Sequence, residues 1–160
     1  GKAGFQIMGD WAKGEFTAAG KVPGVDYYCA PTPSNNGYLY NVDSFIFYKT
    51  SDPEKQEGQK LLAKLMMGKN FQKVFNLYKG SIPARLDVPM DEFDKCAKTS
   101  NSDIKTAGAS GGLVPSFAHG MAQGNTMKAA LQDIITEHFN SDMSSVDAAN
   151  ALADSVLANM

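Results

Sequence analysis

Two acidic residues and the single tryptophan stand where a polar or aromatic side chain could bind a ligand. Trp11 directly follows Asp10 at the end of the apolar run 5–8, and Asp43 interrupts the apolar and aromatic stretch 38–48. A buried carboxylate is costly unless it is paired or hydrogen-bonded. Asp43 is therefore either part of a structural ion pair or a ligand-binding residue. Trp11 is either a core residue or a flat binding surface.

A histidine and two cations stand in comparable surroundings further along the chain. His119 is flanked by small and apolar residues in the stretch 114–121. Lys79 and Arg85 bracket a Gly-Ser-Ile-Pro loop. His119 is either a core histidine with satisfied hydrogen bonds or, like the two cations, part of a binding site.

Sequence motifs of the common enzyme classes are absent. There is no GxSxG, GxxxxGK[ST], GxGxxG or HExxH string, and the glycine-rich stretch 108–112 has no lysine after it to reach a phosphate. His138 closes a polar helical stretch, where it favours the helix dipole rather than a metal. A net charge of -2 gives no electrostatic reason to expect nucleic acid as a partner. The sequence therefore predicts no enzyme, no catalytic site, no metal site and no cofactor.

Cys29 and Cys96 are the two cysteines of the sequence. They form no CxxC pair and lack the clustered spacing of a zinc site. Their spacing leaves two possibilities open: two inert thiols in a cytosolic protein, or one disulfide across a long loop in an exported protein.

Short apolar stretches in the first third of the chain predict β-strands. Residues 5–8 and 25–28 have the length and composition of short strands, and 38–48 is rich in β-branched and aromatic residues. The stretch 31–37 contains prolines and other turn residues, which exclude a helix there.

Helical patterns dominate the rest of the sequence. We expect helices from Gly9 to Gly20, from the Asp52-Pro53 start to a break at Gly68, from there to Lys79, over 90–98, over 116–139 as one broken or two adjoining helices, and from Ser144 onward. The polar stretch 99–112, rich in Ser and Gly, is expected to be a mobile or long connection. Three or four strands make a thin sheet for so many helices, so we expect the helices to need a further surface to pack against.

The sequence also bears on location. No apolar run approaches the roughly 18 residues that a membrane-spanning helix needs. The chain opens without an initiator methionine and without a signal peptide, which is typical of a processed or internal start.

Four stretches together resemble the carboxy-terminal part of periplasmic glucose-binding proteins. They are GKAGFQIMGDWAKGEF, YNVDSFIFYKTS, LYKGSIPARLDVPMDEFDKCAKTS and LVPSFAHGMA, and they follow one another in the family's order. These proteins belong to the large family of extracellular sugar-binding proteins that serve ATP-driven importers. The similarity spans nearly the whole chain and includes the family's Gly-x-Trp after a strand, here at residues 9–11.

The resemblance implies an α/β fold of the periplasmic-binding-protein kind, in which two non-contiguous lobes close on one sugar. Residues 1–160 would be its helix-rich carboxy-terminal portion, with parts of both lobes and without the amino-terminal half. The implied partners are a monosaccharide, with glucose favoured, the membrane permease of an importer, and the amino-terminal portion of the same protein. The implied location is the periplasm, reached by a signal peptide outside this sequence. The alternative is an isolated folding fragment that binds no sugar without its amino-terminal half.

The resemblance also assigns residues. Carried over by position, the family's sugar contacts fall on Trp11, Asp43, Lys79 and His119, with Asp10 and Arg85 as weaker candidates. An indole covers the apolar face of a pyranose, Asp accepts hydroxyl hydrogens, Lys donates to hydroxyl oxygens, and His does either. Lys79 and Arg85 compete for one role because they flank the same loop. In an oxidising periplasm, a Cys29–Cys96 disulfide becomes the better expectation.

Overall fold

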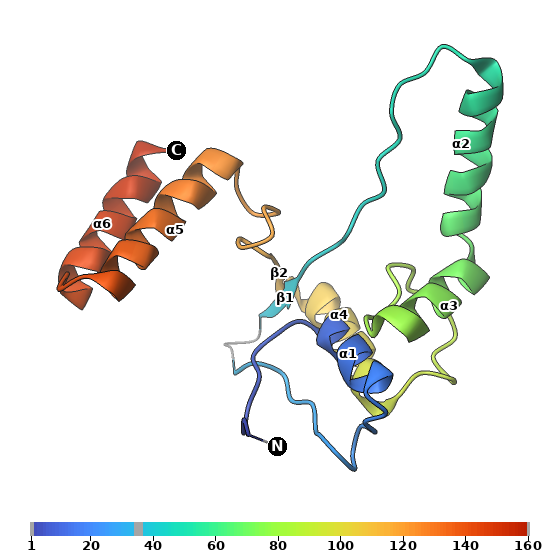
Figure 1. Ribbon diagram of the computed structural model, residues 1–160, viewed down its shortest axis with the longest axis horizontal. Helices are drawn as coiled ribbons and strands as arrows, with labels where there is room; N and C mark the ends of the chain where they lie inside the picture. Colours follow the sequence, from blue (N-terminus) through green and yellow to red (C-terminus); the bar gives the residue numbers. More distant parts are fainter. Residues whose placement is uncertain (1, 34–36, 160) are drawn as a thin grey trace. The chain divides into compact units, whose positions relative to one another are not determined.

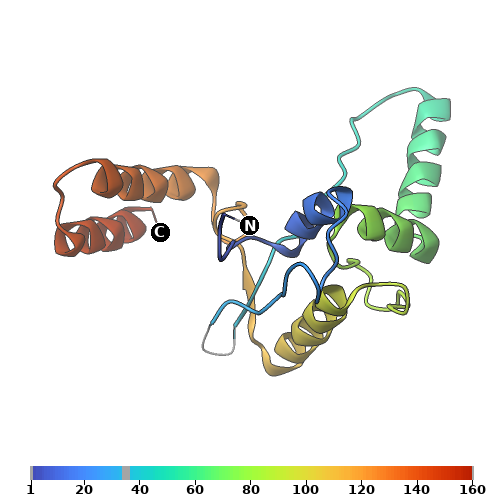
Figure 2. The ribbon, with the colours of Figure 1, turned by 60° about the horizontal axis from the view of Figure 1, so that its bottom comes forward.

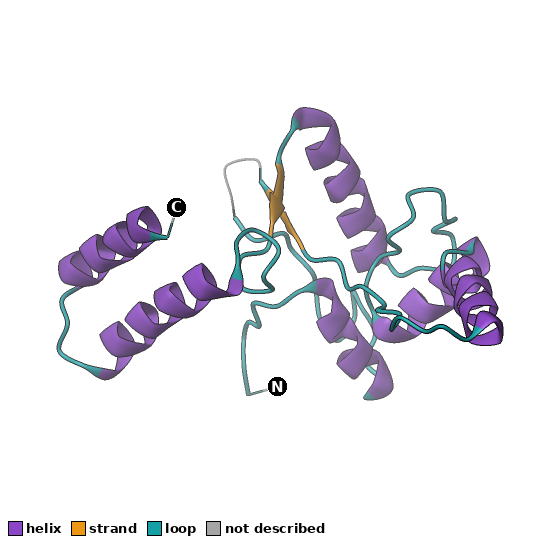
Figure 3. Cartoon of the chain, turned by 90° about the horizontal axis from the view of Figure 1, so that it is seen from above, coloured by secondary structure: helices purple, strands orange, loops and turns teal. Residues whose placement is uncertain are grey.

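The computed structural model describes residues 2–33 and 37–159 of the chain. Its elements follow in the order η1 (Asp10–Ala12), α1 (Lys13–Ala18), β1 (Tyr38–Tyr40), α2 (Pro53–Met66), α3 (Lys69–Lys79), α4 (Lys95–Ser110), β2 (Leu113–Pro115), α5 (Asn125–Asn140) and α6 (Ser145–Ala158) (Figure 1). The two strands form a small sheet, and most of the regular structure is helical (Figure 3). The N–H of Tyr38 donates to the carbonyl of Gly112, and the N–H of Ser116 donates to that of Tyr40, so the strands advance in parallel.

The chain divides into two compact units. The first comprises the chain up to Tyr38 together with Val42–Gly112, and it holds α1 to α4. The second comprises Leu39–Asn41 and the chain from Leu113 onward. Within the second unit, α5 and α6 lie side by side as a helical hairpin (Figure 2).

Local sequence signals set the limits of several helices. The Asp52 carboxylate caps α2, and Pro53 takes the first helical position. Gly68 separates α2 from α3, and Gly80 ends α3 in the left-handed conformation with φ of 88°. Ser144 caps α6 with its hydroxyl. The expectations for these boundaries are confirmed.

The strands expected over 5–8 and 25–28 are wrong. A strand needs a neighbour for its N–H and C=O groups, and the two strands found among the described residues pair with each other. Phe5 is 97% exposed. Residues 22–27 form a turn instead, because the Asp26 carboxylate accepts the N–H of Val22 at 2.8 Å and such local bonds compete with strand formation.

The third expected strand, over 38–48, is confirmed only in β1. The chain then runs from β1 to α2 as a long drawn-out segment without regular structure (Figure 1). The reason is again pairing: among residues 2–33 and 37–159, no strand other than the three-residue β2 is available as a neighbour.

α4 replaces both the short helix expected over 90–98 and the loose connection expected over 99–112. Asp94 caps it by accepting the N–H of Ala97 at 2.9 Å. Along α4, the Thr106 hydroxyl donates to the carbonyl of Ser102 and the Ser110 hydroxyl to that of Thr106, each one turn back. Residues with loop-like composition therefore satisfy their hydrogen bonds inside a helix.

The helix expected from residue 116 begins only at Asn125. Residues 116–121 form a turn that is closed by the N–H of Met121 donating to the carbonyl of Ser116 at 3.0 Å. This turn directly follows β2, so residues 116–121 form a turn at the end of the strand instead of the first part of a helix.

The core of the first unit is small. Its buried members are Val88, Phe93 and Ala97, against which Leu77, Ile82 and Met90 pack. Many large apolar side chains are exposed instead, among them Ile46 and Leu65. This agrees with the expectation that the helices offer more apolar surface than the sheet can cover.

Candidate functional site

Two of the residues singled out from the sequence lie together in the first unit. Lys79 is the last residue of α3, and its ammonium group forms an ion pair with the Asp43 carboxylate. The Lys79 Nζ atom lies 5.8 Å from the centre of the Phe75 ring, within cation–π range. Lys79 is partly buried and Asp43 is exposed, so solvent reaches the pair from the carboxylate side. The pair offers a hydrogen-bond donor and an acceptor side by side.

A close approach of two glycines fixes the backbone at Lys79. A Cβ atom on Gly80 would lie 2.5 Å from the backbone nitrogen of Gly14 in α1. A Cβ atom on Gly14 would lie 2.7 Å from the carbonyl oxygen of Lys79. Side chains at either position would prevent this contact. The start of α1 therefore holds the end of α3 in place.

Asp10 ties the same loop to η1. Its carboxylate accepts the N–H of Ile82 at 3.0 Å. Burial raises the pKa of the Asp10 carboxyl above its usual 3.8, although the hydrogen bond from Ile82 and the charges of Lys13 and Lys79 act in the opposite direction. Asp10 thus supports the loop that follows Lys79.

A buried polar network holds this loop from the side of α3. Asn76 Nδ2 donates to the carbonyl of Gln72 at 2.7 Å, and the Ser81 hydroxyl donates to Asn76 Oδ1 at 2.7 Å. The Gln72 side chain accepts the N–H of Ala84 at 3.2 Å. Analysis of the sequence missed these buried residues. The available signal was the spacing of four between Gln72 and Asn76, which puts two amides on one face of α3.

Trp11 lies in η1, in the same unit as Lys79 and Asp43, and is partly buried. Its ring lies against Gly9, where there is no room for a Cβ atom. The absence of a side chain at Gly9 therefore leaves room for the indole ring of Trp11. This steric requirement is a physical reason for the Gly-x-Trp spacing.

Arg85 has other partners than the Lys79–Asp43 pair. Its guanidinium donates two hydrogen bonds of 2.8 Å to Asp87 and one of 3.1 Å to the carbonyl of Met67. These hydrogen bonds from Arg85 hold the pKa of the Asp87 carboxyl well below its usual range. Arg85 thus links its loop to the junction of α2 and α3, whereas Lys79 reaches Asp43.

His119 belongs to the second unit, whereas Trp11, Asp43 and Lys79 belong to the first. Its Nδ1 atom lies 2.7 Å from the hydroxyl oxygen of Ser116, which is buried. His119 itself is exposed, so the alternative of a core histidine is wrong. The turn after β2 therefore presents the imidazole at a surface.

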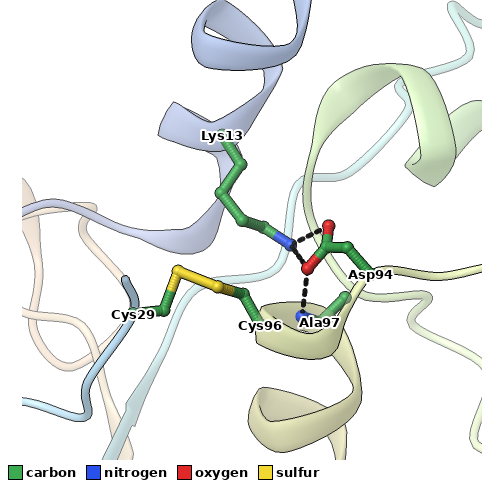
Figure 4. Close-up of a disulfide and its surroundings, with 5 residues drawn as sticks. All are labelled: Lys13, Cys29, Asp94, Cys96 and Ala97. Carbon is green, nitrogen blue, oxygen red and sulfur yellow. Dashed lines mark hydrogen bonds and ion pairs between the residues drawn. A yellow bond between two sulfur atoms is a disulfide. The ribbon is translucent and has the colours of Figure 1, made fainter. Parts of the chain in front are cut away.

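Lys13 and Asp94 form an ion pair close to the disulfide (Figure 4). Lys13 Nζ lies 3.0 and 3.2 Å from the two oxygens of Asp94, and Lys13 is buried. Cys29 and Cys96 are bonded, with 5.6 Å between their Cα atoms, which confirms the pairing that the resemblance favoured. The buried lysine could not be predicted from the sequence, because its partner lies 81 residues away.

The described residues contain neither a metal-binding cluster nor a membrane-spanning helix. Within residues 2–33 and 37–159, no three His, Cys, Asp or Glu side chains gather closely enough to hold a metal ion. No helix in that part of the chain is long and apolar enough to cross a membrane.

Known proteins match the chain over most of its length, although no protein-family model matches it. A probable sugar-binding periplasmic protein of Brucella suis is 45% identical over 98% of the chain. An extracellular-binding protein of an ABC transporter from Pyrococcus horikoshii is 36% identical over 86% of it. A xylose/arabinose-binding protein of Haloferax volcanii is 27% identical over 98% of it.

The chain covers 37%, 30% and 33% of these three relatives, so it spans about one third of their length. Each relative is named as a binding protein and none as an enzyme. The chain therefore belongs to the family of extracellular sugar-binding proteins of ABC transporters.

Proposed function

We propose that this chain is part of a protein that binds a monosaccharide and delivers it to the membrane permease of an ATP-driven importer. The protein acts in the periplasm and catalyses no reaction. The names of the Brucella and Haloferax relatives support a sugar as ligand. Glucose is the favoured sugar because four stretches of the chain resemble glucose-binding proteins, while the Haloferax relative makes pentoses the competing choice.

In this proposal, residues 1–160 contribute parts of two lobes that close on the sugar, and the amino-terminal portion contributes the rest. The helix-rich fold with its small parallel sheet is compatible with this arrangement.

The Lys79–Asp43 pair is the observation that carries the proposal. Adjacent hydroxyls of a sugar both donate and accept hydrogen bonds, and the pair provides an acceptor and a donor for them. Each charge-assisted hydrogen bond contributes roughly 1.5–3 kcal/mol. Gly14, Gly80 and Asp10 hold the Lys79 side of the pair before any ligand arrives, which lowers the cost of ordering it.

The remaining proposed contacts have complementary roles. The Trp11 indole stacks on the apolar face of the sugar ring. His119 exchanges a hydrogen bond with a hydroxyl of the sugar. Asp10 acts through the loop that it supports, and Arg85 acts through the backbone that it ties to Met67.

Titration of the complete binding protein with glucose, followed by tryptophan fluorescence and calorimetry, tests this proposal. Asp43→Asn should weaken glucose binding at least about tenfold, because it removes a charge-assisted hydrogen bond. Glu57→Gln is a matched control: the side chains of Glu57 and Asp43 are both 63% exposed, and Glu57 also pairs with a lysine, Lys60. This control should leave the affinity unchanged.

The same titration is repeated with xylose and arabinose. If a pentose binds saturably and glucose does not, the proposed ligand is wrong, but the proposed sugar-binding function stands. No saturable response to any of the three sugars would overturn the proposal.

A second candidate function is that of a folding fragment that binds no sugar until its amino-terminal portion joins it. The exposure of large apolar side chains such as Phe5 and Ile7 favours this candidate for the chain alone. Glucose should then bind to a mixture of the two portions and not to the 160-residue chain. Binding by the chain alone, at the affinity of the mixture, would exclude it.

A further inference from the structure

Lys13 is the first residue of α1, and its side chain is buried. Its Nζ atom lies 3.0 and 3.2 Å from the two oxygens of Asp94. A buried ion pair is weak evidence for stability, because apolar residues of similar volume often stabilise a fold as well when they replace both partners. What the pair specifies is position, since a buried ammonium group that moves away from Asp94 loses its counter-charge. Lys13 therefore fixes where α1 begins with respect to α4.

The partner of Lys13 is itself held in place. The Asp94 carboxylate also accepts the N–H of Ala97 at 2.9 Å and so caps α4. Two residues after Asp94, Cys96 is bonded to Cys29, so the disulfide fastens the first turn of α4 to the segment between α1 and β1 (Figure 4). The disulfide therefore restricts how far the carboxylate that binds Lys13 can move.

α1 needs such an anchor, because a helix of six residues is not stable alone. The backbone at its start lies against the backbone at the end of α3: a Cβ atom on Gly80 would lie 2.5 Å from the Gly14 nitrogen and 3.1 Å from the carbonyl carbon of Lys13. Lys13 thus contacts α4 with its side chain, while its backbone abuts the end of α3. At that end of α3, Lys79 forms its ion pair with Asp43.

The charge of Lys13 supports the same loop by a second route. The Asp10 carboxylate accepts the N–H of Ile82 at 3.0 Å. Burial raises the pKa of the Asp10 carboxyl, and the positive charge of Lys13 acts in the opposite direction. Lys13 thereby favours the ionised carboxylate, which accepts the stronger hydrogen bond. The loop after α3 is therefore supported at Gly80 by the backbone of α1 and at Ile82 by Asp10.

We propose that Lys13 is a positioning residue for sugar binding. Anchored by Asp94 and the disulfide, it holds the end of α3 so that Lys79 meets Asp43 and the sugar in one geometry. The effect on affinity rests on the proposed function, whereas the positioning of Lys79 does not. A consequence is that the redox state of a disulfide outside the proposed sugar contacts changes the affinity for the sugar.

Hydrogen exchange of the complete binding protein without sugar tests the positioning. Lys13→Met should speed exchange of the Gly80 and Ile82 amides at least about fivefold, because their hydrogen bonds to Asn76 and Asp10 open more often. Amides of α5, which belongs to the second unit, should keep their rates. Unchanged rates at Gly80 and Ile82, or the same acceleration in α5, would overturn the inference.

A second lysine provides a matched control. Lys21 follows α1 closely and also forms an ion pair, with Asp26 at 3.5 Å, but its side chain is 55% exposed. Lys21→Met removes a positive charge from the same part of the chain without touching the Asp94 link. It should leave the exchange of Gly80 and Ile82 unchanged, and an acceleration equal to that of Lys13→Met would contradict the assigned role.

Calorimetric titration with glucose, or with the pentose that binds if glucose does not, tests the effect on affinity. At a temperature where both proteins are fully folded, Lys13→Met should raise the dissociation constant at least about fivefold, whereas a mere loss of stability leaves it unchanged. Reduction of the disulfide should also raise it. The two changes together should raise it by less than the product of their separate effects, because both act through the link between Asp94 and Lys13.

The outcomes separate this inference from the proposed function. If the wild type binds sugar and Lys13→Met binds it equally well, or if the two effects multiply in full, the inference is overturned and the proposed function stands. If the wild type binds none of the sugars, the proposed function fails, and exchange at Gly80 and Ile82 alone decides whether Lys13 positions the end of α3. If Lys13→Met does not fold, both measurements on the wild type before and after reduction replace it, with the same expected directions.

Discussion

At the scale of single residues, the Lys13–Asp94 ion pair is strongly asymmetric. The side chain of Lys13 is 6% exposed, whereas that of Asp94 is 35% exposed and also caps α4. A carboxylate left alone there can be hydrated, but an ammonium left alone in the interior cannot. The two members of the pair therefore contribute unequally to stability.

This asymmetry leads to a prediction for two substitutions. Asp94→Asn keeps an N-cap residue but leaves Lys13 buried without a counter-charge, and should cost about 3 kcal/mol. Lys13→Met leaves a hydrated carboxylate and should cost about 1 kcal/mol. Urea unfolding of the two variants measures the difference. Equal losses, or a larger loss for Lys13→Met, would contradict it.

Asp10 gives a prediction for pH. Its pKa is higher in the folded protein than its usual 3.8, chiefly because of burial, so the folded state binds the proton more tightly than the unfolded state. Stability contributed by this group is therefore largest below pH 3.8 and falls as the pH rises through the pKa of the folded state. Asp10→Asn, which retains an acceptor for Ile82 N–H, should remove this component. The difference in unfolding free energy between the two proteins should shift in favour of the wild type as the pH is lowered, and a shift in the opposite direction would contradict the assignment.

At the scale of elements, two glycines that end helices offer a controlled comparison. Gly80 and Gly111 follow α3 and α4 with φ of 88° and 72°. Alanine costs about 1–2 kcal/mol at either position because of the left-handed backbone. At Gly111 a Cβ meets open space, whereas at Gly80 it collides with Gly14. Gly80→Ala should therefore lower the unfolding free energy further, by about 1–3 kcal/mol beyond Gly111→Ala. Urea unfolding of both variants tests this, and equal losses would argue against the α1–α3 contact.

The limits of α2, α3 and α6 could be predicted because residues next to the helix ends determine them. Strands could not be predicted in the same way, since pairing depends on residues far away in the sequence. The run 45–48 has strand composition but no neighbouring strand among the described residues, and residues of loop-like composition form the 16-residue helix α4.

In the candidate site too, some residues could be identified from the sequence and others could not. The resemblance identified Trp11, Asp43 and Lys79, and the structure places them in one unit. The resemblance also offered Asp10 as a weaker candidate, but the contacts that support Lys79 could not be predicted, because the residues that make them are distant in the sequence. Asp10 bonds to a residue 72 positions away, and Gly14 touches the end of a helix that starts at Lys69.

At the scale of the whole molecule, the disulfide constrains two distant parts of the first unit. It links positions 67 residues apart, and the chain-entropy model gives about 4 kcal/mol for a loop of this length. Reduction, or Cys29→Ser with Cys96→Ser, should lower the free energy of unfolding by about that amount. Hydrogen exchange in α5 and α6 should not change, because both cysteines belong to the first unit. Loss of protection in that hairpin on reduction would contradict the division into units.

The position of the same disulfide also affects how the protein is made. In the proposed export to the periplasm, Cys29 leaves the ribosome and the export channel well before Cys96, and α2 and α3 emerge between them. The bond cannot close until 67 further residues have followed. In the proposed periplasmic location, Cys29 then has to persist as a thiol in an oxidising compartment during this interval. Correct maturation therefore depends on the relative rates of translocation and thiol oxidation.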